Sequence, residues 1–453
     1  MLTNKIRSIF SKFISSRLHY FFSGRNHLDL EFGRVAFYSY LFMRYSSNWH
    51  QTRFLKFHDV PSLFWQPLSL FKFLPLEHIY IFNNSTFYAL MLFCYAMSAI
   101  GLFSKIFIPL SFITSYIFIG FPNNFGTVFD STCMVTVILG LLCFSNAGSR
   151  ISIDSFRRNK EKSASQLPQI WFLNFVPFMI MFFYFCSALQ KIRFASTDFF
   201  TPDHMSIAMI YNKAPLGHYL AQFKWVGILA SITIVLIQLA TIVPLFIKKY
   251  ILPFSLVYLL FHLSVDITMG EHFNLMKICY VFIFPWSLFF NDIRSLLMRK
   301  KIIKKESLIL NQHSRTIKFY VIISAITFSI ASYTVFKNSP LWPFSTTTMY
   351  AFLDELPYKK KEIYLIGKSE YLVTSNDLKP IGKTKMRLTI NNLLADGHSL
   401  KRIATETKKF IETNTNLEYK YLEIRVCTYH TIKELRDQYP NLKDCEVKTR
   451  LSF

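Results

Sequence analysis

Charged residues are scarce in this sequence. They make up 17% of its 453 residues, whereas 52% of the residues are hydrophobic and the mean hydropathy is +0.27. A chain of this length with so few charges is hard to keep soluble in water, and a lipid solvent removes that difficulty. The composition therefore predicts an integral membrane protein whose first partner is membrane lipid.

Acidic residues are the rarer of the charged ones, with 27 Asp and Glu against 51 Lys and Arg. An excess of this size could by itself indicate binding to nucleic acid. The basic residues, however, cluster in short loops between apolar runs, as expected when Lys and Arg hold loops on the cytoplasmic side of a membrane. We therefore expect no nucleic-acid partner.

Several patterns are missing. The seven cysteines form no CxxC pair, so no metal or redox motif of that kind is predicted. Five of them lie in apolar segments as packing residues, while Cys427 and Cys445 lie in the tail and would pair if it faces an oxidising compartment. Residues 1–29 lack the apolar core and cleavage site of a signal peptide and are expected to be a basic cytoplasmic arm. No internal repeat is found, which argues against a transporter built from duplicated halves.

Long apolar runs dominate residues 30–336. A membrane-spanning helix needs about twenty mostly apolar residues. The candidate segments are 31–47, 84–104, 106–121, 127–145, 168–190, 225–247, 250–267, 274–291 and 317–336. We therefore predict an all-α polytopic membrane bundle of about nine transmembrane helices.

The basic loops set the expected orientation. The N-terminal arm is basic, and so are the alternate loops at Lys105, at 150–162, at 248–249 and from Arg294 to Arg315. With nine spans, this pattern places the N-terminus in the cytoplasm and everything after Phe336 outside. The abundance of Lys, Ile, Phe and Asn suggests an AT-rich genome, so the expected location is a bacterial inner membrane.

Residues 337–453 have the pattern of a small soluble domain. Glu362 to Ile366 and Tyr419 to Val426 alternate as strands do, and Ser399 to Ile411 carries apolar residues at helical spacing. A segment of roughly a hundred residues can form a modest core. We predict an extracytoplasmic α+β domain and find no catalytic motif in it.

The first candidate for chemistry is Lys191, which ends the long apolar fifth span at the predicted outer face. In one interpretation its stem lies in lipid and its ammonium group reaches water. In the other, the side chain turns into the bundle, where the loss of water favours a neutral amine that can act as a base.

A second group of ionisable residues lies in and after the seventh span, which ends on the same side as Lys191. His262 and Asp266 are four residues apart and share a helix face, so a metal site with His272 is conceivable. The spacing matches no standard zinc site, and a histidine in a helix is more often a packed, hydrogen-bonded residue. We expect no metal.

The connection between the fifth and sixth spans contains further polar residues, namely Asp198, Asp203, His204 and His218. It also lies on the predicted outer side. We interpret it as a solvated loop with ordinary polar residues.

Short segments around these residues resemble one family. Ser187-Ala-Leu-Gln-Lys-Ile192 is similar to an Ala-Gly-Val-Lys-Lys-Leu segment, and Phe261-His262 to a Phe-His on a later helix. Residues 33–42 resemble a first span, and 141–154 resemble a Phe-rich helix that closes in a Ser-Val-Asp or Ser-Leu-Asp turn. These are features of the membrane domain of vitamin K-dependent gamma-glutamyl carboxylase and of its bacterial relatives, the horizontally transferred transmembrane (HTTM) proteins. The resemblance covers roughly residues 30–295.

The resemblance implies a reaction. Lys191 would be the base that deprotonates a reduced quinone of the vitamin K or menaquinol type. The quinol would then react with oxygen to give a strong base that removes a proton from a substrate carbon, which carbon dioxide traps. His262 would orient or hydrogen-bond the quinone oxygen, and a protein or peptide substrate would arrive from the extracytoplasmic side.

The sequence departs from the family in two places. Residues 128–132 are Val-Phe-Asp-Ser-Thr where the carboxylase has Asn-Asn-His-Ser, so a histidine of the carboxylase site is missing. Carboxylation is therefore less supported than quinone chemistry. The short tail from about 340 stands in place of the long lumenal domain that grips the carboxylase substrate, so substrate recognition must differ.

Two hypotheses follow. A quinol-dependent membrane enzyme requires Lys191 and His262 to face one apolar pocket. A non-catalytic membrane module, whose tail binds a partner or lipid, allows Lys191 to point to water. A transporter or a metal-dependent lipid-modifying enzyme is less favoured, because few charges lie deep in the predicted spans.

Overall fold

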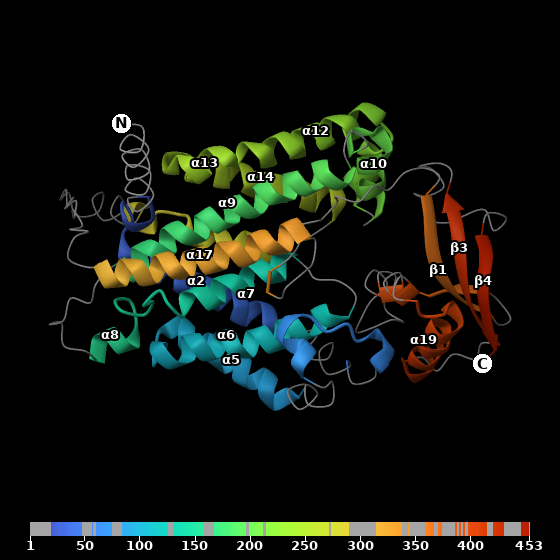
Figure 1. The fold of residues 1–453 in the computed structure, drawn as a ribbon, viewed down its shortest axis with the longest axis horizontal. Helices are drawn as coiled ribbons and strands as arrows, with labels where there is room; N and C mark the ends of the chain where they lie inside the picture. Colours follow the sequence, from blue (N-terminus) through green and yellow to red (C-terminus); the bar gives the residue numbers. More distant parts are fainter. Residues whose placement is uncertain are drawn as a thin grey trace, which may run out of the picture.

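The computed structural model describes the chain in segments separated by short gaps. These segments are residues 20–47, 57, 60–74, 84–125, 130–157, 167–195, 199–211, 214–270, 273–289, 314–337, 343–344, 358–366, 370–373, 386, 389–390, 393–394, 397–414, 420–429 and 445–452. Most of the described residues are helical, and a small sheet forms near the C-terminus (Figure 1). The predicted helical bundle with a small α+β tail is confirmed in this coarse form.

The bundle consists of long helices that run roughly alongside one another (Figure 1). They are α2 (His27–Tyr45), α5 (Ser85–Ile100), α6 (Ser104–Gly120), α7 (Asp130–Leu142), α9 (Leu167–Ala195), α12 (Lys224–Ala240), α14 (Ile251–Met269) and α17 (Ser314–Lys337). Short helices connect them: α8 (Ile153–Arg157), α10 (Pro202–Tyr211), α11 (Pro215–Leu220), α13 (Ile242–Phe246) and α15 (Asn274–Cys279). Single 3-10 turns are η2 (Ser62–Phe64), η3 (Ser69–Phe73), η4 (Phe121–Asn124), η6 (Lys248–Tyr250) and η7 (Tyr280–Phe282).

Local sequence signals place several helix ends. The Asn84 side chain caps α5 by accepting a hydrogen bond from the backbone N–H of Phe87 at 2.8 Å. Gly101 ends α5 and Gly270 ends α14, and both adopt positive φ angles of 70° and 67°. Glycine is suited to this left-handed position after a helix because it has no side chain to clash.

Five helical segments are long and apolar enough to cross a membrane, counted over the described residues. They are Ser104–Asn124, Leu167–Phe194, Lys224–Phe246, Lys248–Met269 and Arg315–Lys337. Two more apolar helices are shorter, Ser85–Ile100 and Ser131–Leu142. The structure thus supports a membrane protein with several spans, while the number nine stays a prediction.

The predicted span over 274–291 is not one continuous helix. Residues 274–282 form α15 and η7. The helix is then interrupted at 283–285, and one further helical turn follows at 286–289. Pro285 cannot donate a helical hydrogen bond. In addition, the Arg25 guanidinium donates to the carbonyl oxygens of Phe282, Ile283 and Phe284, at 3.0, 2.8 and 3.3 Å. These carbonyls therefore bind a side chain instead of continuing a helix.

The predicted first span also differs from an apolar membrane helix, because α2 carries a buried ion pair. Glu31 and Arg34 are both 0% exposed, and Arg34 Nε donates to Glu31 Oε2 at 3.2 Å. The guanidinium also donates to the carbonyl oxygens of Ser98, Ala99 and Ile151. This arrangement ties α2 to the C-terminal end of α5 and to the segment before α8.

The carboxylate of Glu31 also accepts hydrogen bonds from backbone groups. Its Oε1 accepts hydrogen bonds from the backbone N–H groups of Gly148 at 3.0 Å and Ser149 at 2.9 Å. Nearby, Asp154 accepts from the backbone N–H groups of Phe103 and Ser104, at 2.9 and 2.7 Å. The segments 33–42 and 141–154, which carry part of the family resemblance, are therefore joined in space by buried charge.

The C-terminal sheet has the strand order β2-β1-β3-β4 and is antiparallel throughout. Its strands are β1 (Tyr358–Ile366), β2 (Glu370–Leu372), β3 (Tyr421–Tyr429) and β4 (Cys445–Ser452), and helix α19 (Leu400–Asn414) packs against β3 and β4. The predicted strands and helix are thus confirmed where they fall on described residues. Cys427 and Cys445 form a disulfide that joins the register partners of β3 and β4.

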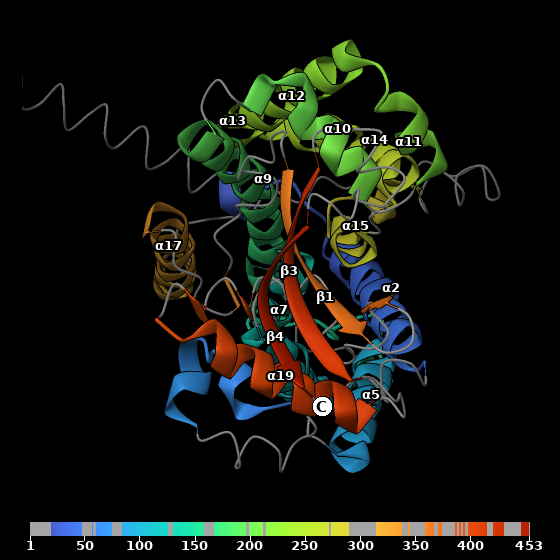
Figure 2. The ribbon, with the colours of Figure 1, turned by 90° about the vertical axis from the view of Figure 1, so that its right-hand side faces the viewer.

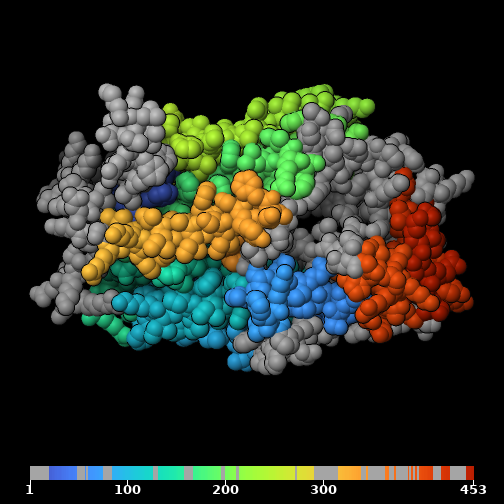
Figure 3. Space-filling model, viewed as in Figure 1, coloured from blue at the N-terminus to red at the C-terminus, as the bar shows by residue number. Residues whose placement is uncertain are grey.

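The tail lies at one end of the bundle, and its sheet crosses the space between the ends of the helices (Figures 1 and 2). Tyr364 and Cys427 belong to the same buried apolar cluster as Phe199, Met205 and Val265 of the bundle. The opposite end of the bundle carries α8 and α13 (Figure 1). The space-filling view shows the long helices packed side by side, with α17 on the surface (Figure 3).

Candidate active site in the membrane bundle

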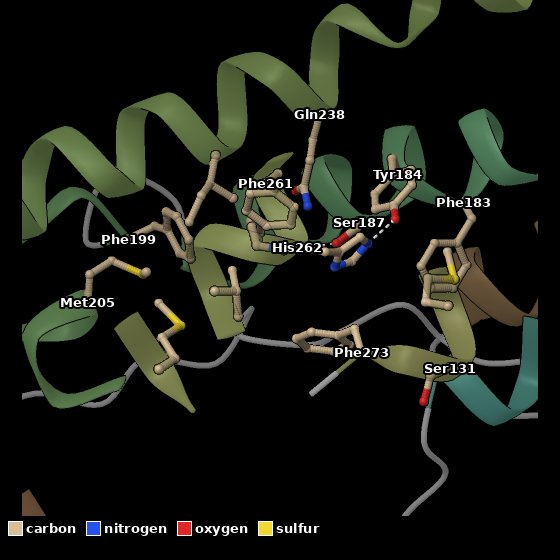
Figure 4. A pocket seen from close by; sticks show the side chains of 15 residues that line it. Ser131, Phe183, Tyr184, Ser187, Phe199, Met205, Gln238, Phe261, His262 and Phe273 are labelled. Atoms are coloured by element: carbon tan, nitrogen blue, oxygen red, sulfur yellow. Dashed lines mark hydrogen bonds between the residues drawn. The ribbon is translucent and has the colours of Figure 1, made fainter. Parts of the chain in front are cut away.

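A pocket near the tail end of the bundle brings the predicted site residues together (Figure 4). It contains about 650 Å³ of space not filled by atoms, part of it open to the outside. Its polar lining residues are Ser131, Tyr184, Ser187, Lys191, Gln238 and His262. Its apolar lining residues are Phe183, Phe199, Met205, Ile234, Phe261, Val265, Met269, Phe273 and Met276. Aromatic and aliphatic walls with a few convergent polar groups are typical of ligand sites.

Helix periodicity explains why these side chains meet. Tyr184, Ser187 and Lys191 are spaced by three and four residues and therefore share one face of α9. His262 and Val265 share a face of α14 in the same way. Helix α12 packs against α9, and α14 also contacts α9, so the pocket lies where the three helices meet.

Lys191 is buried in this pocket, with 2% of its surface exposed. Its ammonium nitrogen Nζ donates a hydrogen bond to Ser187 Oγ at 2.8 Å, one helical turn earlier. The interpretation in which Lys191 extends along lipid to reach water is therefore wrong for this structure. The side chain turns inward, as the enzyme hypothesis requires.

His262 is 4% exposed and is held by a chain of tyrosines. Tyr280 donates from its hydroxyl to the Tyr184 hydroxyl at 2.6 Å, and the Tyr184 oxygen lies 2.5 Å from His262 Nε2. Tyr258 stacks on the Tyr184 ring with a centroid distance of 3.7 Å. Packing from three sides thus fixes the imidazole at the pocket wall.

Two lining residues, Gln238 and Ser131, were not predicted. Gln238 is 5% exposed, and its side chain extends from α12 into the pocket (Figure 4). The sequence carries a signal for it, since Gln238 is the only amide or charged side chain between Trp225 and Ile247. Strongly polar residues within a membrane span often mark a functional site. Ser131 lies in the 128–132 segment that departs from the family, of which 128–129 are outside the described residues.

His262 and Asp266, the candidate metal ligands that the structure describes, are not part of a metal-binding group. Asp266 pairs with the ammonium group of Lys277. His272 lies outside the described residues. Over the residues that the structure describes, no group of three or more His, Cys, Asp or Glu side chains is placed to hold a metal ion.

The connection after α9 is not the solvated loop that we predicted. It forms α10 and α11, which pack on α12 and α14. His204 is 2% exposed and its ring lies 4.8 Å from the Phe199 ring, while His218 Nε2 lies 3.0 Å from the Ile210 carbonyl oxygen. Apolar residues on α10 bury this segment over the end of the pocket. Asp198 lies outside the described residues.

Comparisons with known proteins return no relative. No family model, no curated protein and no solved structure matches the chain. The family resemblance therefore stays a prediction from short motifs, and the pocket is the feature from which a function can be inferred.

Proposed function

We propose that this protein is a membrane enzyme in which Lys191 acts as a base toward a reduced quinone and His262 holds the quinol oxygen. One observation carries the proposal: both side chains line a single pocket whose remaining walls are mostly aromatic and aliphatic. They come from different helices, α9 and α14, and both are almost fully buried. A lysine whose role is only to anchor a helix end would extend to water instead.

The chemistry of the pocket lining supports a reduced quinone as its ligand. Phe183, Phe261 and Phe273 supply flat apolar surfaces for an aromatic ring. Lys191 and His262 supply polar groups for its oxygens. When bound, a quinol supplies a weakly acidic O–H group and two electrons that oxygen can accept.

Lys191 would receive the proton of that O–H group. The low-polarity walls exclude the water that would otherwise compete for the proton. Ser187 Oγ accepts from Lys191 Nζ at 2.8 Å, and both residues line the pocket. This contact supports a role for Lys191 at the pocket.

We further propose that the end of the bundle with the tail is extracytoplasmic and that a bacterial inner membrane holds the protein. Lys105, Arg157 and Lys249 lie at the opposite end, near α8 and α13, as the positive-inside pattern requires. The Cys427–Cys445 disulfide suits an oxidising compartment. A protein or peptide substrate would then approach from the side of the tail.

Carboxylation is not part of this proposal. The carboxylase motif has a histidine before its fourth span, whereas this chain has Asp130 and Ser131 at the start of α7. Oxidation of a quinol by oxygen requires only the base and the binding pocket. Oxygen is the acceptor of the two electrons that the quinol loses.

The decisive experiment measures oxygen consumption and quinone epoxide formation by the purified protein given reduced menaquinone or reduced vitamin K. Lys191→Ala should abolish turnover, because the base is gone. Lys191→Arg should abolish it as well, because a guanidinium retains its proton and cannot act as a base.

Lys249→Ala is the matched control, since Lys249 is an exposed lysine at the opposite end of the bundle. It should turn over quinol like the wild type. Folded wild-type protein that consumes no oxygen with either quinol would contradict the proposal and favour a non-catalytic module whose tail binds a partner or lipid.

A further inference from the structure

Two buried polar atoms in the pocket have no hydrogen-bond partner among the described residues. They are Nδ1 of His262 and Oε1 of Gln238. The two side chains are 4% and 5% exposed, and both line the pocket. Leaving such atoms unmatched is costly in a folded protein, and binding sites are where this cost is offset by a ligand.

The hydrogen bonds among Tyr280, Tyr184 and His262 determine which nitrogen of the His262 ring carries the proton. Because the Tyr184 hydroxyl accepts a hydrogen bond from Tyr280, its own proton is available for His262 Nε2. A neutral imidazole that accepts at Nε2 carries its proton at Nδ1. The unmatched Nδ1 is therefore a hydrogen-bond donor.

Gln238 presents a hydrogen-bond acceptor instead of a donor. Its Oε1 is a carbonyl oxygen and can only accept. The amide reaches the pocket from α12 and the imidazole reaches it from α14, so the pocket lining contains one donor and one acceptor without partners among the described residues (Figure 4).

We propose that Gln238 and His262 together recognise a hydroxyl group on an aromatic ring, which in a quinol is the hydroxyl that Lys191 does not deprotonate, with Gln238 accepting a hydrogen bond from it and His262 Nδ1 donating to its oxygen. A hydroxyl oxygen satisfies both atoms at once. A ketone satisfies only His262 and places its lone pairs against Gln238 Oε1, and a methyl ether does the same. Resting on the proposed quinol function, this pair makes the site selective for the reduced ligand over the oxidised one.

Binding is measured without turnover, so this test is independent of whether Lys191 acts as a base. The probes are 1-naphthol, 1-methoxynaphthalene and menadione, titrated calorimetrically into the purified protein under argon. The wild type should bind 1-naphthol at least about tenfold more tightly than the ether, because the ether leaves Gln238 Oε1 unmatched. Gln238→Leu should remove that preference, because 1-naphthol loses its acceptor and the ether and menadione no longer face Gln238 Oε1.

Gln190→Leu is the matched control. Gln190 is also a buried glutamine with an unmatched Oε1 among the described residues, but it does not line this pocket. It should keep the wild-type preference. If Gln238→Leu fails to fold, Gln238→Glu, which retains an acceptor, and Gln238→Met, which does not, make the same comparison.

The tautomer is tested separately by nitrogen-15 NMR of histidine-labelled protein. His262 should carry its proton at Nδ1 in the wild type, and Tyr184→Phe should shift the population toward the other tautomer. Equal binding of 1-naphthol and its ether to folded wild type, no measurable binding of 1-naphthol, or an unchanged preference in Gln238→Leu would each overturn the proposal.

Discussion

Buried polar residues in this protein differ in whether all of their polar atoms have hydrogen-bond partners. Glu31 and Arg34 are surrounded by backbone groups and by each other. At the pocket, His262 and Gln238 each keep one atom without a partner among the described residues. Complete matching is expected of a structural ion pair, whereas incomplete matching is expected of a site that awaits a ligand. Substitutions of Glu31 and Arg34 therefore test stability, and substitutions of His262 and Gln238, which line the pocket, test binding.

The first prediction at this scale concerns Glu31. Glu31→Ala leaves the Arg34 guanidinium buried without its counter-charge and leaves the backbone N–H groups of Gly148 and Ser149 without their acceptor. Breaking a buried pair in this way costs about 3–5 kcal/mol. The loss should appear in the free energy of unfolding measured by titration with denaturing detergent.

Glu406→Ala is the control for that measurement. Glu406 pairs with Lys409 on the surface of α19, where the lysine side chain is 64% exposed. Its removal should cost less than about 1 kcal/mol, because water screens exposed pairs. A cost for Glu31→Ala as small as that of Glu406→Ala would show that α2 is not held by its buried charge.

At the scale of elements, apolar run length predicted the long helices α9, α12, α14 and α17 well. A run of twenty apolar residues has few alternatives to a helix when backbone groups must be matched internally. The prediction of a continuous span over 274–291 was wrong because Arg25, which binds carbonyl oxygens of this segment, is about 258 residues away in the chain. No local pattern reveals a contact at that separation.

The same reasoning explains what could be predicted of the site. Lys191 and His262 were identified because each stands out within an apolar run. Their meeting depends on how α9 and α14 pack, which the sequence does not show directly. Gln238 was not predicted because one amide in a long apolar helix indicates a binding site only when the residues across the pocket from it are known.

The disulfide between β3 and β4 gives a prediction at this scale. Cys427 and Cys445 close a loop with a sequence separation of 18 residues, for which the chain-entropy account gives about 3 kcal/mol. Cys445→Ser should therefore lower the free energy of unfolding of the tail by about that amount. Limited proteolysis with and without reductant would measure it.

Reductant should destabilise the tail of the wild type and have no further effect on Cys445→Ser. The other five cysteines are free and mostly buried, so they give no second disulfide to reduce among the described residues. Equal proteolysis of the wild type in both conditions would contradict the prediction.

At the scale of the whole molecule, the tail lies at one end of the bundle (Figures 1 and 2), and residues that line the pocket pack against it there. Phe199, Met205 and Val265 line the pocket and also pack in the apolar cluster that contains Tyr364 and Cys427. The sheet is therefore continuous with the pocket wall, and a change in the tail can reach the site through packed side chains. Such an arrangement suits an enzyme whose polar substrate comes from the side of the tail and whose apolar ligand comes from the membrane.

The orientation of the whole molecule can be tested by labelling. Lys401 lies exposed on α19 in the tail, and Lys105 lies exposed at the start of α6, at the other end of the bundle. A membrane-impermeant maleimide applied to intact bacterial spheroplasts should label Lys401→Cys. It should label Lys105→Cys only after the membrane is permeabilised, because basic loops remain in the cytoplasm.

The wild type provides the background for this experiment, since its tail cysteines are joined and its remaining thiols are buried or half-buried. The opposite pattern, with Lys105→Cys labelled in intact spheroplasts, would place the tail and the pocket end in the cytoplasm. A cytoplasmic tail would face a reducing environment, in which the Cys427–Cys445 bond is not expected to persist. Labelling and disulfide content must therefore agree, and the two measurements together determine from which side of the membrane a polar substrate can reach Lys191.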